Sequence, residues 1–289
     1  MPETVNAVLR ARNRVLDLRG GAAVMGIVNV TPDSFYERAG SVEAAVAAAR
    51  AMADEGAALI DLGGQSYAAG NGEVAAEEER WRVVPAVEAV ASARLGVMLS
   101  VDTYTPSVAD AALAAGAHLI NDCSGLADPE LAAVVAKYDA GLVVMHLKGR
   151  LKVREPEAYV YDDVMAEIVA FLHERVERAV AAGVRRDAIV VDPGLEFGKE
   201  PATDLEILRR FGELRALGAP VLLAASRKSF LGRIVGRPAA ELLPASLGAA
   251  AVGITAGARI VRTHDVAETV QLARFMAAVT GNSTTPLPV

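Results

Sequence analysis

Val190-Val-Asp-Pro-Gly-Leu-Glu-Phe-Gly-Lys199 has the pattern of a buried strand that delivers a carboxylate into a turn. The apolar run 188–191 is typical of a parallel strand that is covered on both faces. Pro193 and Gly194 then direct the chain out of the strand. We therefore expect Asp192 at the carboxyl end of a buried strand, which is where α/β enzymes place their chemistry.

The same arrangement recurs along the chain. Eight apolar runs alternate with segments of helical periodicity, at intervals of roughly 30 residues, and about 250 residues is the usual length of a (β/α)₈ TIM barrel. A doubly wound open sheet is the alternative, but no Gly-x-Gly-x-x-Gly follows the first run and the composition does not change at mid-chain. We predict an α/β fold, a single-domain TIM barrel, with strands at 23–28, 58–62, 97–101, 118–120, 141–145, 188–191, 220–224 and 258–261.

The predicted barrel domain spans residues 21–281. Residues 1–20 form an N-terminal lead-in with a short strand near 15–18, and residues 282–289, which include two prolines, form a flexible tail. The connection 147–161 is long and charged, which is typical of lids and binding loops.

Composition excludes several classes of protein. The chain has 289 residues, 53% of them hydrophobic, and one cysteine, so an intramolecular disulfide framework or a cysteine-based metal site is excluded. A formal net charge of −7 argues against a generic nucleic-acid surface. The sequence lacks both a run of about 18 apolar residues and a secretion signal at its start, so we expect a cytoplasmic protein that does not enter a membrane.

Polar or glycine residues follow every predicted strand. Because the carboxyl ends of barrel strands meet on one rim, residues that are distant in sequence become neighbours there. Any one of them could serve only its own turn, but the pattern at all eight ends indicates a binding site. The residues are Asn29, Gly63-Gly64, Asp102, Asn121, His146, Asp192, Ser226-Arg-Lys228 and Arg262 with His264.

This set divides into two chemical groups. Asp102, Asn121 and Asp192 offer oxygen acceptors and an amide donor, which suit a flat heterocycle with adjacent N–H and amino groups. Met145 and Phe197 are candidates to cover the faces of such a ring, or else ordinary core residues. The second group is basic, and in many barrels this sector holds a phosphate, although ion pairs would explain it too. Its members are Arg227, Lys228, Arg262 and His264.

Seven motifs, in register over about residues 22–280, make the chain resemble the dihydropteroate synthase family. They are Asn29-Val-Thr-Pro-Asp-Ser-Phe35, Ser100-Val-Asp-Thr103, Ile120-Asn-Asp122, Val144-Met-His146, Asp192-Pro-Gly194 with Phe197-Gly-Lys199, Ser226-Arg-Lys-Ser229 and Arg262-x-His264.

The resemblance implies a transferase of folate biosynthesis. Such an enzyme joins 6-hydroxymethyl-7,8-dihydropterin diphosphate to p-aminobenzoate and releases diphosphate with the assistance of Mg²⁺, usually as a homodimer. By this resemblance the pterin is held by Asp102, Asn121, Met145, Asp192, Phe197 and Lys228. Asn29, Arg262 and His264 serve the diphosphate, with Asn29 also the metal ligand. Ser229 lies on the p-aminobenzoate side, and Lys228, Arg262 and His264 are the catalytic set.

The loop after the second predicted strand departs from the family. The usual Gly-Gly-Glu-Ser-Thr-Arg-Pro-Gly is Gly63-Gly-Gln-Ser-Tyr-Ala-Ala-Gly70 here, so Tyr67, Ala68 and Ala69 replace Thr, Arg and Pro. The usual Gly-x-Gly-Phe that follows Asp-Pro is also changed, because Glu196 replaces its second Gly. The loop change leaves open a paralogue that binds the pterin without condensing it, unless Arg38 or Lys148 supplies the missing cation. A pterin-dependent methyltransferase is the third reading, and the retained phosphate signature weighs against it.

Overall fold

A closed parallel barrel forms the centre of the molecule in the computed structural model, which describes residues 8–30, 42–67, 72–153 and 159–281. Eight strands of these residues close in the order β10-β3-β4-β5-β6-β7-β8-β9. The TIM barrel predicted from the sequence is confirmed, and the open sheet is wrong. The strands are β3 (Ala23–Asn29), β4 (Leu59–Gly63), β5 (Met98–Asp102), β6 (Leu119–Asp122), β7 (Gly141–Met145), β8 (Ile189–Asp192), β9 (Val221–Leu223) and β10 (Ala258–Thr263).

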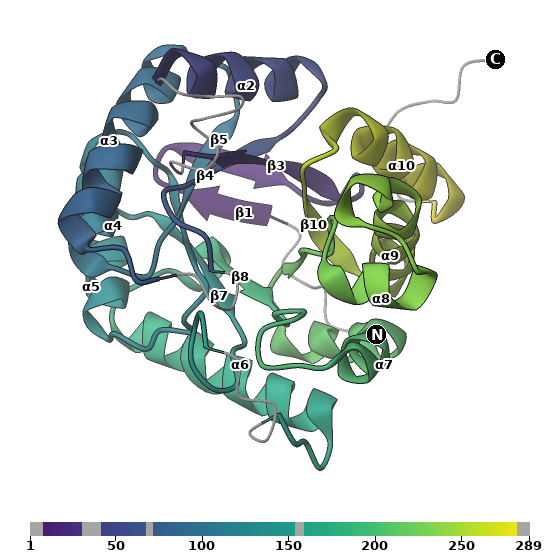
Figure 1. Ribbon diagram of the computed structural model, residues 1–289. Coiled ribbons are helices and arrows are strands. Elements are labelled where there is room, and N and C mark those ends of the chain that lie inside the picture. Colours follow the sequence, from purple (N-terminus) through teal and green to yellow (C-terminus); the bar gives the residue numbers. More distant parts are fainter. Residues whose placement is uncertain (1–7, 31–41, 68–71, 154–158, 282–289) are drawn as a thin grey trace.

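Helices surround the strands, as Figure 1 shows. They follow the strands in the alternating order that the apolar periodicity predicted. The α-helices are α2 (Val42–Asp54), α3 (Ala76–Ser92), α4 (Pro106–Ala114), α5 (Glu130–Lys137), α6 (Val164–Ala181), α7 (Pro201–Arg209), α8 (Ser229–Val235), α9 (Leu243–Ala256) and α10 (Val266–Val279). Short 3₁₀ segments are η2 (Arg186–Ala188), η3 (Phe211–Leu217) and η4 (Ala239–Glu241).

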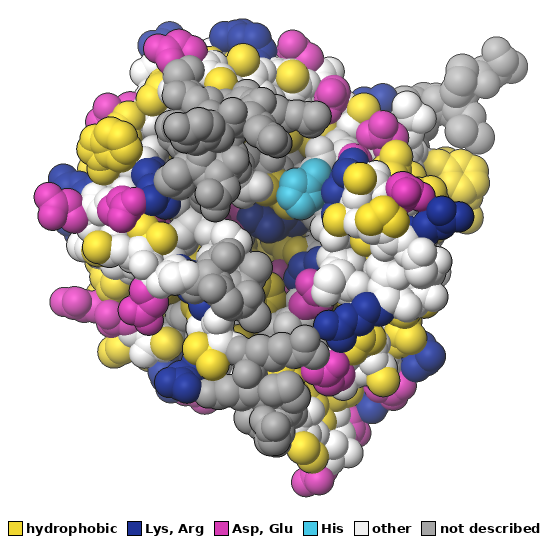
Figure 2. All heavy atoms as spheres, in the orientation of Figure 1, with side chains coloured by type: hydrophobic (Ala, Val, Ile, Leu, Met, Phe, Trp, Pro, Cys, Tyr) yellow, Lys and Arg dark blue, Asp and Glu magenta, His cyan; other side chains and the backbone are white. Residues whose placement is uncertain are grey.

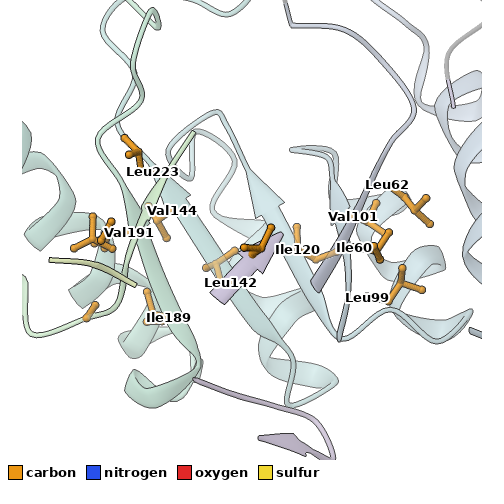
Figure 3. Packing of buried hydrophobic residues seen from close by; sticks show 14 of the residues in the cluster. Ile60, Leu62, Leu99, Val101, Ile120, Leu142, Val144, Ile189, Val191 and Leu223 are labelled. Atoms are coloured by element: carbon orange, nitrogen blue, oxygen red, sulfur yellow. The ribbon is translucent and has the colours of Figure 1, made fainter. Parts of the chain in front are cut away.

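Side chains alternate along each strand between two apolar layers, because successive residues of a strand point to opposite faces. Ile60, Leu62, Leu99 and Val101 belong to the layer between strands and helices, part of which Figure 3 shows. The other parity fills the barrel interior near the amino ends of the strands. That interior layer contains Met25, Leu59, Met98, Leu119, Val143, Val190, Leu222 and Ile260.

A two-stranded hairpin packs against the interior layer. Strands β1 (Val8–Ala11) and β2 (Arg14–Asp17) pair antiparallel, and β2 corresponds to the short strand expected near 15–18. Leu9 and Ala11, with Leu18 just after the hairpin, are fully buried in the same cluster as the barrel interior. The lead-in therefore covers the apolar end of the barrel, which the sequence did not indicate.

Several boundaries differ from the prediction. Strands β3, β5, β6, β8 and β10 continue past their predicted ends, so these strands include residues that were expected just after them: Asn29, Asp102, Asn121, Asp192 and Arg262. The helix expected over 205–217 is split into α7 and η3. None of the helices in the described ranges is long and apolar enough to cross a membrane.

The hairpin gives a test of how the barrel is closed at its apolar end. We expect Leu9→Ala to lower the free energy of unfolding by about 3 kcal/mol, because a fully buried leucine leaves a cavity when it is truncated. Val15→Ala is the matched control in the same hairpin, where the side chain is 57% exposed, and should change stability by less than about 0.5 kcal/mol. Urea unfolding followed by circular dichroism measures both; equal losses would show that the hairpin does not seal the core.

Candidate active site

Strand register places Asn29, Asp102 and Asn121 in one layer at the mouth of the barrel. Asn29 pairs with Gly63, Gly63 with Asp102, and Asp102 with Asn121 across four neighbouring strands. Asp102 is four residues after the interior Met98, and Asn121 is two residues after the interior Leu119, so both share the inward parity. The barrel interior thus changes from apolar to polar along the direction of the strands.

Arg262 connects three of these strands through one buried network. Its Nε donates to Asp61 Oδ2 at 2.7 Å, and its Nη2 donates to Asp102 Oδ2 at 2.9 Å. Asn121 Nδ2 donates to the same Asp61 oxygen at 2.9 Å. A side chain from β10 therefore reaches across the mouth to carboxylates on β4 and β5.

The network around Arg262 leaves some carboxylate oxygens free to accept further hydrogen bonds. Burial lowers the pKa of Arg262, but Asp61 and Asp102 more than offset this and raise it above its usual range. Burial raises the pKa of Asp102 well above normal, although Arg262 opposes the shift. Within the described residues, Oδ1 of Asp61 and Oδ1 of Asp102 are buried without a hydrogen-bond partner. Buried acceptors of this kind normally find donors, so a ligand with N–H groups would satisfy them.

Asp192 and Lys228 interact electrostatically in the neighbouring sector of the mouth. Asp192 Oδ1 accepts from the Gly194 amide at 2.7 Å, and Lys228 Nζ donates to Leu195 O at 2.5 Å. Burial raises the pKa of Asp192 and lowers that of Lys228, and each charge partly counters the shift of the other. The pair therefore carries a hydrogen-bond acceptor and a donor close together at the mouth.

Apolar side chains flank this pair. The Lys228 ammonium lies 4.9 Å from the centroid of the Phe197 ring. A Cβ placed on Gly194 would lie 3.1 Å from Met145 Cγ and 2.0 Å from the His146 carbonyl, and φ at Gly194 is +66°. Only glycine fits this close approach. Met145 and Phe197 therefore border the turn that carries Asp192.

Lys199 and His146 form a buried polar contact behind that turn. Lys199 Nζ lies 2.9 Å from His146 Nδ1 and donates to Phe197 O at 2.8 Å. Burial lowers the pKa of Lys199 to about 7 and that of His146 to about 2, so the imidazole is neutral. This contact ties the Asp192 turn to the end of β7 and explains why a polar residue follows that strand.

The basic group expected to bind phosphate does not act as one unit. Arg227 is held by Asp265 in an ion pair, with Nε 2.9 Å from Oδ2, which is the ion-pair alternative for this group; its role toward phosphate stays a prediction. His264 is exposed and its Nδ1 lies 3.0 Å from Ser226 Oγ. Desolvation by the surrounding chain and the charge of Arg262 lower its pKa to about 4, which makes it a neutral donor at pH 7.

The divergent loop after β4 is held by a new set of contacts. Gln65 donates to Glu79 Oε2 at 2.8 Å and accepts from Lys152 Nζ at 2.6 Å. The Tyr67 hydroxyl donates to the Asp102 carbonyl at 3.2 Å, so its side chain lies against the end of β5. Residues 68–71 are outside the described ranges, and so are Ala68, Ala69 and the proposed substitute Arg38.

Lys148 does not supply the cation that the loop lacks. Its ammonium pairs with Glu167 at 2.7 Å and lies 4.0 Å from the centroid of the Tyr161 ring. The Lys152 ammonium lies closer to the altered loop, 5.8 Å from the Tyr67 ring centroid. It is buried and donates to Gln65. Among the described side chains, neither lysine therefore contacts the Arg262 network.

Asn29 ends β3 with an exposed side chain. A Cβ on Gly63 would lie 3.7 Å from Asn29 Oδ1 and 3.8 Å from Asp102 Cβ, so the amide borders the polar layer. The described ranges contain no group of three or more His, Cys, Asp or Glu that could hold a metal alone. One amide oxygen fits Mg²⁺ only where substrate phosphates supply further ligands. Figure 2 shows a hollow near the centre of this face, with Lys or Arg side chains and a histidine beside it.

Comparison with known proteins agrees with this geometry. A sequence model of the family described as "Pterin binding enzyme" matches residues 25–264. The Escherichia coli dihydropteroate synthase is 40% identical over 257 residues, which are 88% of this chain and 90% of that protein. The chain belongs to the dihydropteroate synthase family. Members of this family are transferases.

Two further members bear on the site. The structure of the Xanthomonas albilineans dihydropteroate synthase with 4-aminobenzoic acid superposes with a TM-score of 0.88 at 40% identity, covering 97% of this chain and 99% of that one. A Mycobacterium leprae protein named "Inactive dihydropteroate synthase 2" is 42% identical over 268 residues, 89% of this chain and 90% of that protein. The dihydropteroate synthase fold therefore also occurs in a protein that is named inactive.

Asp61 is the functional residue that the sequence analysis missed. It lies inside the apolar run 58–62, two residues after the interior Leu59, so it has inward parity. An aspartate inside an apolar strand, at a position that points into the barrel, is a signal that can be read from the sequence. The sequence analysis considered only residues at the strand ends, and Asp61 lies before the end of its strand.

Asp61 can be tested through stability. Asp61→Asn should lower the free energy of unfolding by about 3 kcal/mol, because it removes a fully buried carboxylate that pairs with Arg262. Asp110→Asn is the control, since Asp110 forms an exposed pair with Lys137 and should matter by less than about 0.5 kcal/mol. Guanidinium unfolding measures both. An Asp61 variant as stable as the wild type would mean that the network contributes no net stability.

Proposed function

We propose that the protein condenses 6-hydroxymethyl-7,8-dihydropterin diphosphate with p-aminobenzoate and releases diphosphate. The observation that carries this proposal is the buried acceptor set around Arg262. Two carboxylate oxygens there have no hydrogen-bond partner among the described residues, in a layer that also holds Asn121. Family membership supports the same reaction.

The pterin would occupy the mouth between the Asp102 and Asp192 sectors. A pterin carries an amino group beside ring N–H groups, which suits carboxylate acceptors held in fixed positions. Asn121 adds an amide and Lys228 a donor for the ring oxygen. Met145 and Phe197 border the turn that carries Asp192, where they would contact the faces of the ring.

The diphosphate would lie toward Asn29, Arg262 and His264. Arg262 is charged throughout the usual pH range, and His264 can donate as a neutral imidazole. Asn29 would provide one oxygen ligand to Mg²⁺, which supplies charge neutralisation for phosphate oxygens when it is bound. To engage the diphosphate, Arg262 has to exchange part of its contact with Asp61 and Asp102 for phosphate oxygens.

The reaction needs no nucleophile from the protein. The amine nitrogen forms a bond to the pterin methylene carbon, the carbon–oxygen bond to diphosphate breaks, and the amine loses a proton. The electron-rich pterin ring can spread positive charge that develops on the methylene carbon. The residues of the mouth therefore act by orienting the ring and by stabilising the departing negative charge.

A family member that binds the pterin without condensing it is the second candidate. The observation in its favour is the loop after β4, where Tyr67 contacts Asp102 and the family arginine is replaced by Ala68. A relative that is 42% identical over 268 residues is named inactive, which is consistent with this candidate. A pterin-dependent methyltransferase has no comparable support, because the names of the relatives are those of synthases.

We also propose a cytoplasmic homodimer. Val252 on α9 and both Phe275 and Val279 on α10 are about half or more exposed, and these two helices pack together. Such side chains would add apolar area to a subunit interface.

Condensation is tested by diphosphate release in the presence of both substrates and Mg²⁺. We expect turnover that requires all three components, and Asp192→Asn should lower kcat/KM for the pterin diphosphate about 100-fold, through loss of a charged hydrogen-bond acceptor. Asp110→Asn is the surface control and should match the wild type. Absence of turnover, with pterin binding still detected by calorimetry, would contradict condensation and leave the second candidate.

The altered loop has its own test. The triple variant Tyr67→Thr, Ala68→Arg, Ala69→Pro should raise kcat at least about tenfold, because it restores a cation near the leaving group. The double variant Tyr67→Thr, Ala69→Pro is the matched control, since it changes the loop without the charge. Equal rates for the two variants would show that the arginine is not what this loop lacks. Activity in the triple variant alone, with none in the wild type, would support the second candidate.

A further inference from the structure

The turn after Asp192 places the Glu196 carboxylate against residues that follow β9. Glu196 Oε1 accepts from the Ser229 hydroxyl at 2.7 Å and from the Phe230 amide at 2.6 Å. Lys228, immediately before them, donates to Leu195 O of the same turn. Glu196 therefore already uses two neighbouring donors at the edge of the proposed active site.

The position of Glu196 is fixed by the fold and is not a chance rotamer. Its φ is +68°, a left-handed conformation that costs a non-glycine residue free energy unless its surroundings hold it. Its amide donates to Asp204 Oδ1 at 2.9 Å, and Asp204 is fully buried. Phe197, the next residue, donates its amide to Gly194 O at 3.1 Å. The backbone thus directs the Glu196 side chain toward Ser229, at a position where the family pattern has glycine.

The hydrogen bonds that Glu196 accepts from Ser229 and Phe230 matter because the proposed second substrate also carries a carboxylate. Ser229 is the residue expected on the p-aminobenzoate side, and p-aminobenzoate has a carboxylate opposite its reacting amine. A substrate carboxylate that approaches Ser229 and the Phe230 amide meets an existing carboxylate with the same needs. The substrate carboxylate and the Glu196 carboxylate would repel each other when both lie near Ser229. The Ser229 hydroxyl and the Phe230 amide can donate well to only one of them.

We propose that Glu196 is a specificity-determining residue that competes with the carboxylate of the amine substrate for Ser229 and the Phe230 amide. This inference rests on the proposed condensation and specifies its second substrate. The enzyme disfavours anionic anilines and accepts anilines with a neutral para substituent comparatively well. The Glu196 side chain accepts hydrogen bonds from Ser229 and Phe230 and not from the residues proposed to hold the pterin, so we expect its main effect on the second substrate.

Steady-state kinetics with a pair of amines tests the proposal. The probes are p-aminobenzoate and the neutral 4-aminobenzamide, at saturating pterin diphosphate and Mg²⁺. In Glu196→Gly the KM for p-aminobenzoate should fall at least tenfold, while KM for 4-aminobenzamide and for the pterin diphosphate stays within about twofold. Glu196→Gln, which keeps an acceptor but removes the charge, should give an intermediate decrease.

Glu177→Gln is the matched control. Glu177 lies on α6 and pairs with Arg186 at 2.8 Å, away from the contacts of Ser229, and its substitution removes one surface charge. This variant should leave all three KM values unchanged. Thermal unfolding of every variant separates a specificity effect from a folding defect, and Glu196→Gln remains the test if the glycine variant does not fold.

The outcomes separate this proposal from the proposed function. Unchanged KM for p-aminobenzoate in both Glu196 variants, or equal changes for both amines, would overturn the role of Glu196 while condensation stands. If no variant turns over, condensation itself fails. Calorimetry with p-aminobenzoate, added to protein that holds 6-hydroxymethylpterin and diphosphate, then replaces kinetics. Binding at least tenfold tighter in Glu196→Gly supports the proposal, and equal or absent binding overturns it.

Discussion

The Arg262 guanidinium bridges two buried carboxylates across the mouth of the barrel, and the arrangement of the polar layer depends on this bridge. A side chain on β10 reaches Asp61 on β4 and Asp102 on β5, and Asn121 on β6 joins the same Asp61 oxygen. Charges buried in this way must be paired, because an isolated one is very costly to desolvate. The pairing therefore fixes how these four strands present their polar side chains.

The bridge also explains why the site is ready for a ligand. Each carboxylate gives Arg262 one oxygen, and its other oxygen is buried without a partner in the part of the chain that the structure describes. A ligand that brings N–H donors to this layer satisfies groups that already paid their desolvation on folding. On the other side of the mouth, burial disfavours the charged forms of Asp192 and Lys228. The attraction between their opposite charges offsets part of this desolvation free energy. In the proposed function, recognition of a flat, donor-rich ring depends on this set of fixed groups more than on any single residue.

Much of this could be predicted from the sequence, because strand ends in a parallel barrel converge. The eight apolar runs predicted the strands, and the polar residues after them predicted which side chains share the mouth. What the sequence could not supply is pairing at the level of side chains. Arg227 and Arg262 look equivalent in sequence, yet Asp265 holds the first and the barrel carboxylates hold the second.

Other features depend on contacts between segments far apart in the chain. Leu9 enters the barrel interior from a hairpin whose sequence is short and only weakly patterned. The Glu196 carboxylate reaches Ser229 only because a left-handed backbone turn aims it there. Asp61 was the exception, because its inward parity within an apolar strand was visible and was overlooked.

A crystal structure of the protein with a bound dihydropterin diphosphate tests the central claim most directly. The account predicts the ring within hydrogen-bonding distance of Asp102, Asn121 and Asp192, with the diphosphate on Arg262. A pterin bound elsewhere on the barrel, with the bridge from Arg262 to Asp61 and Asp102 intact and these acceptors still unpaired, would contradict it.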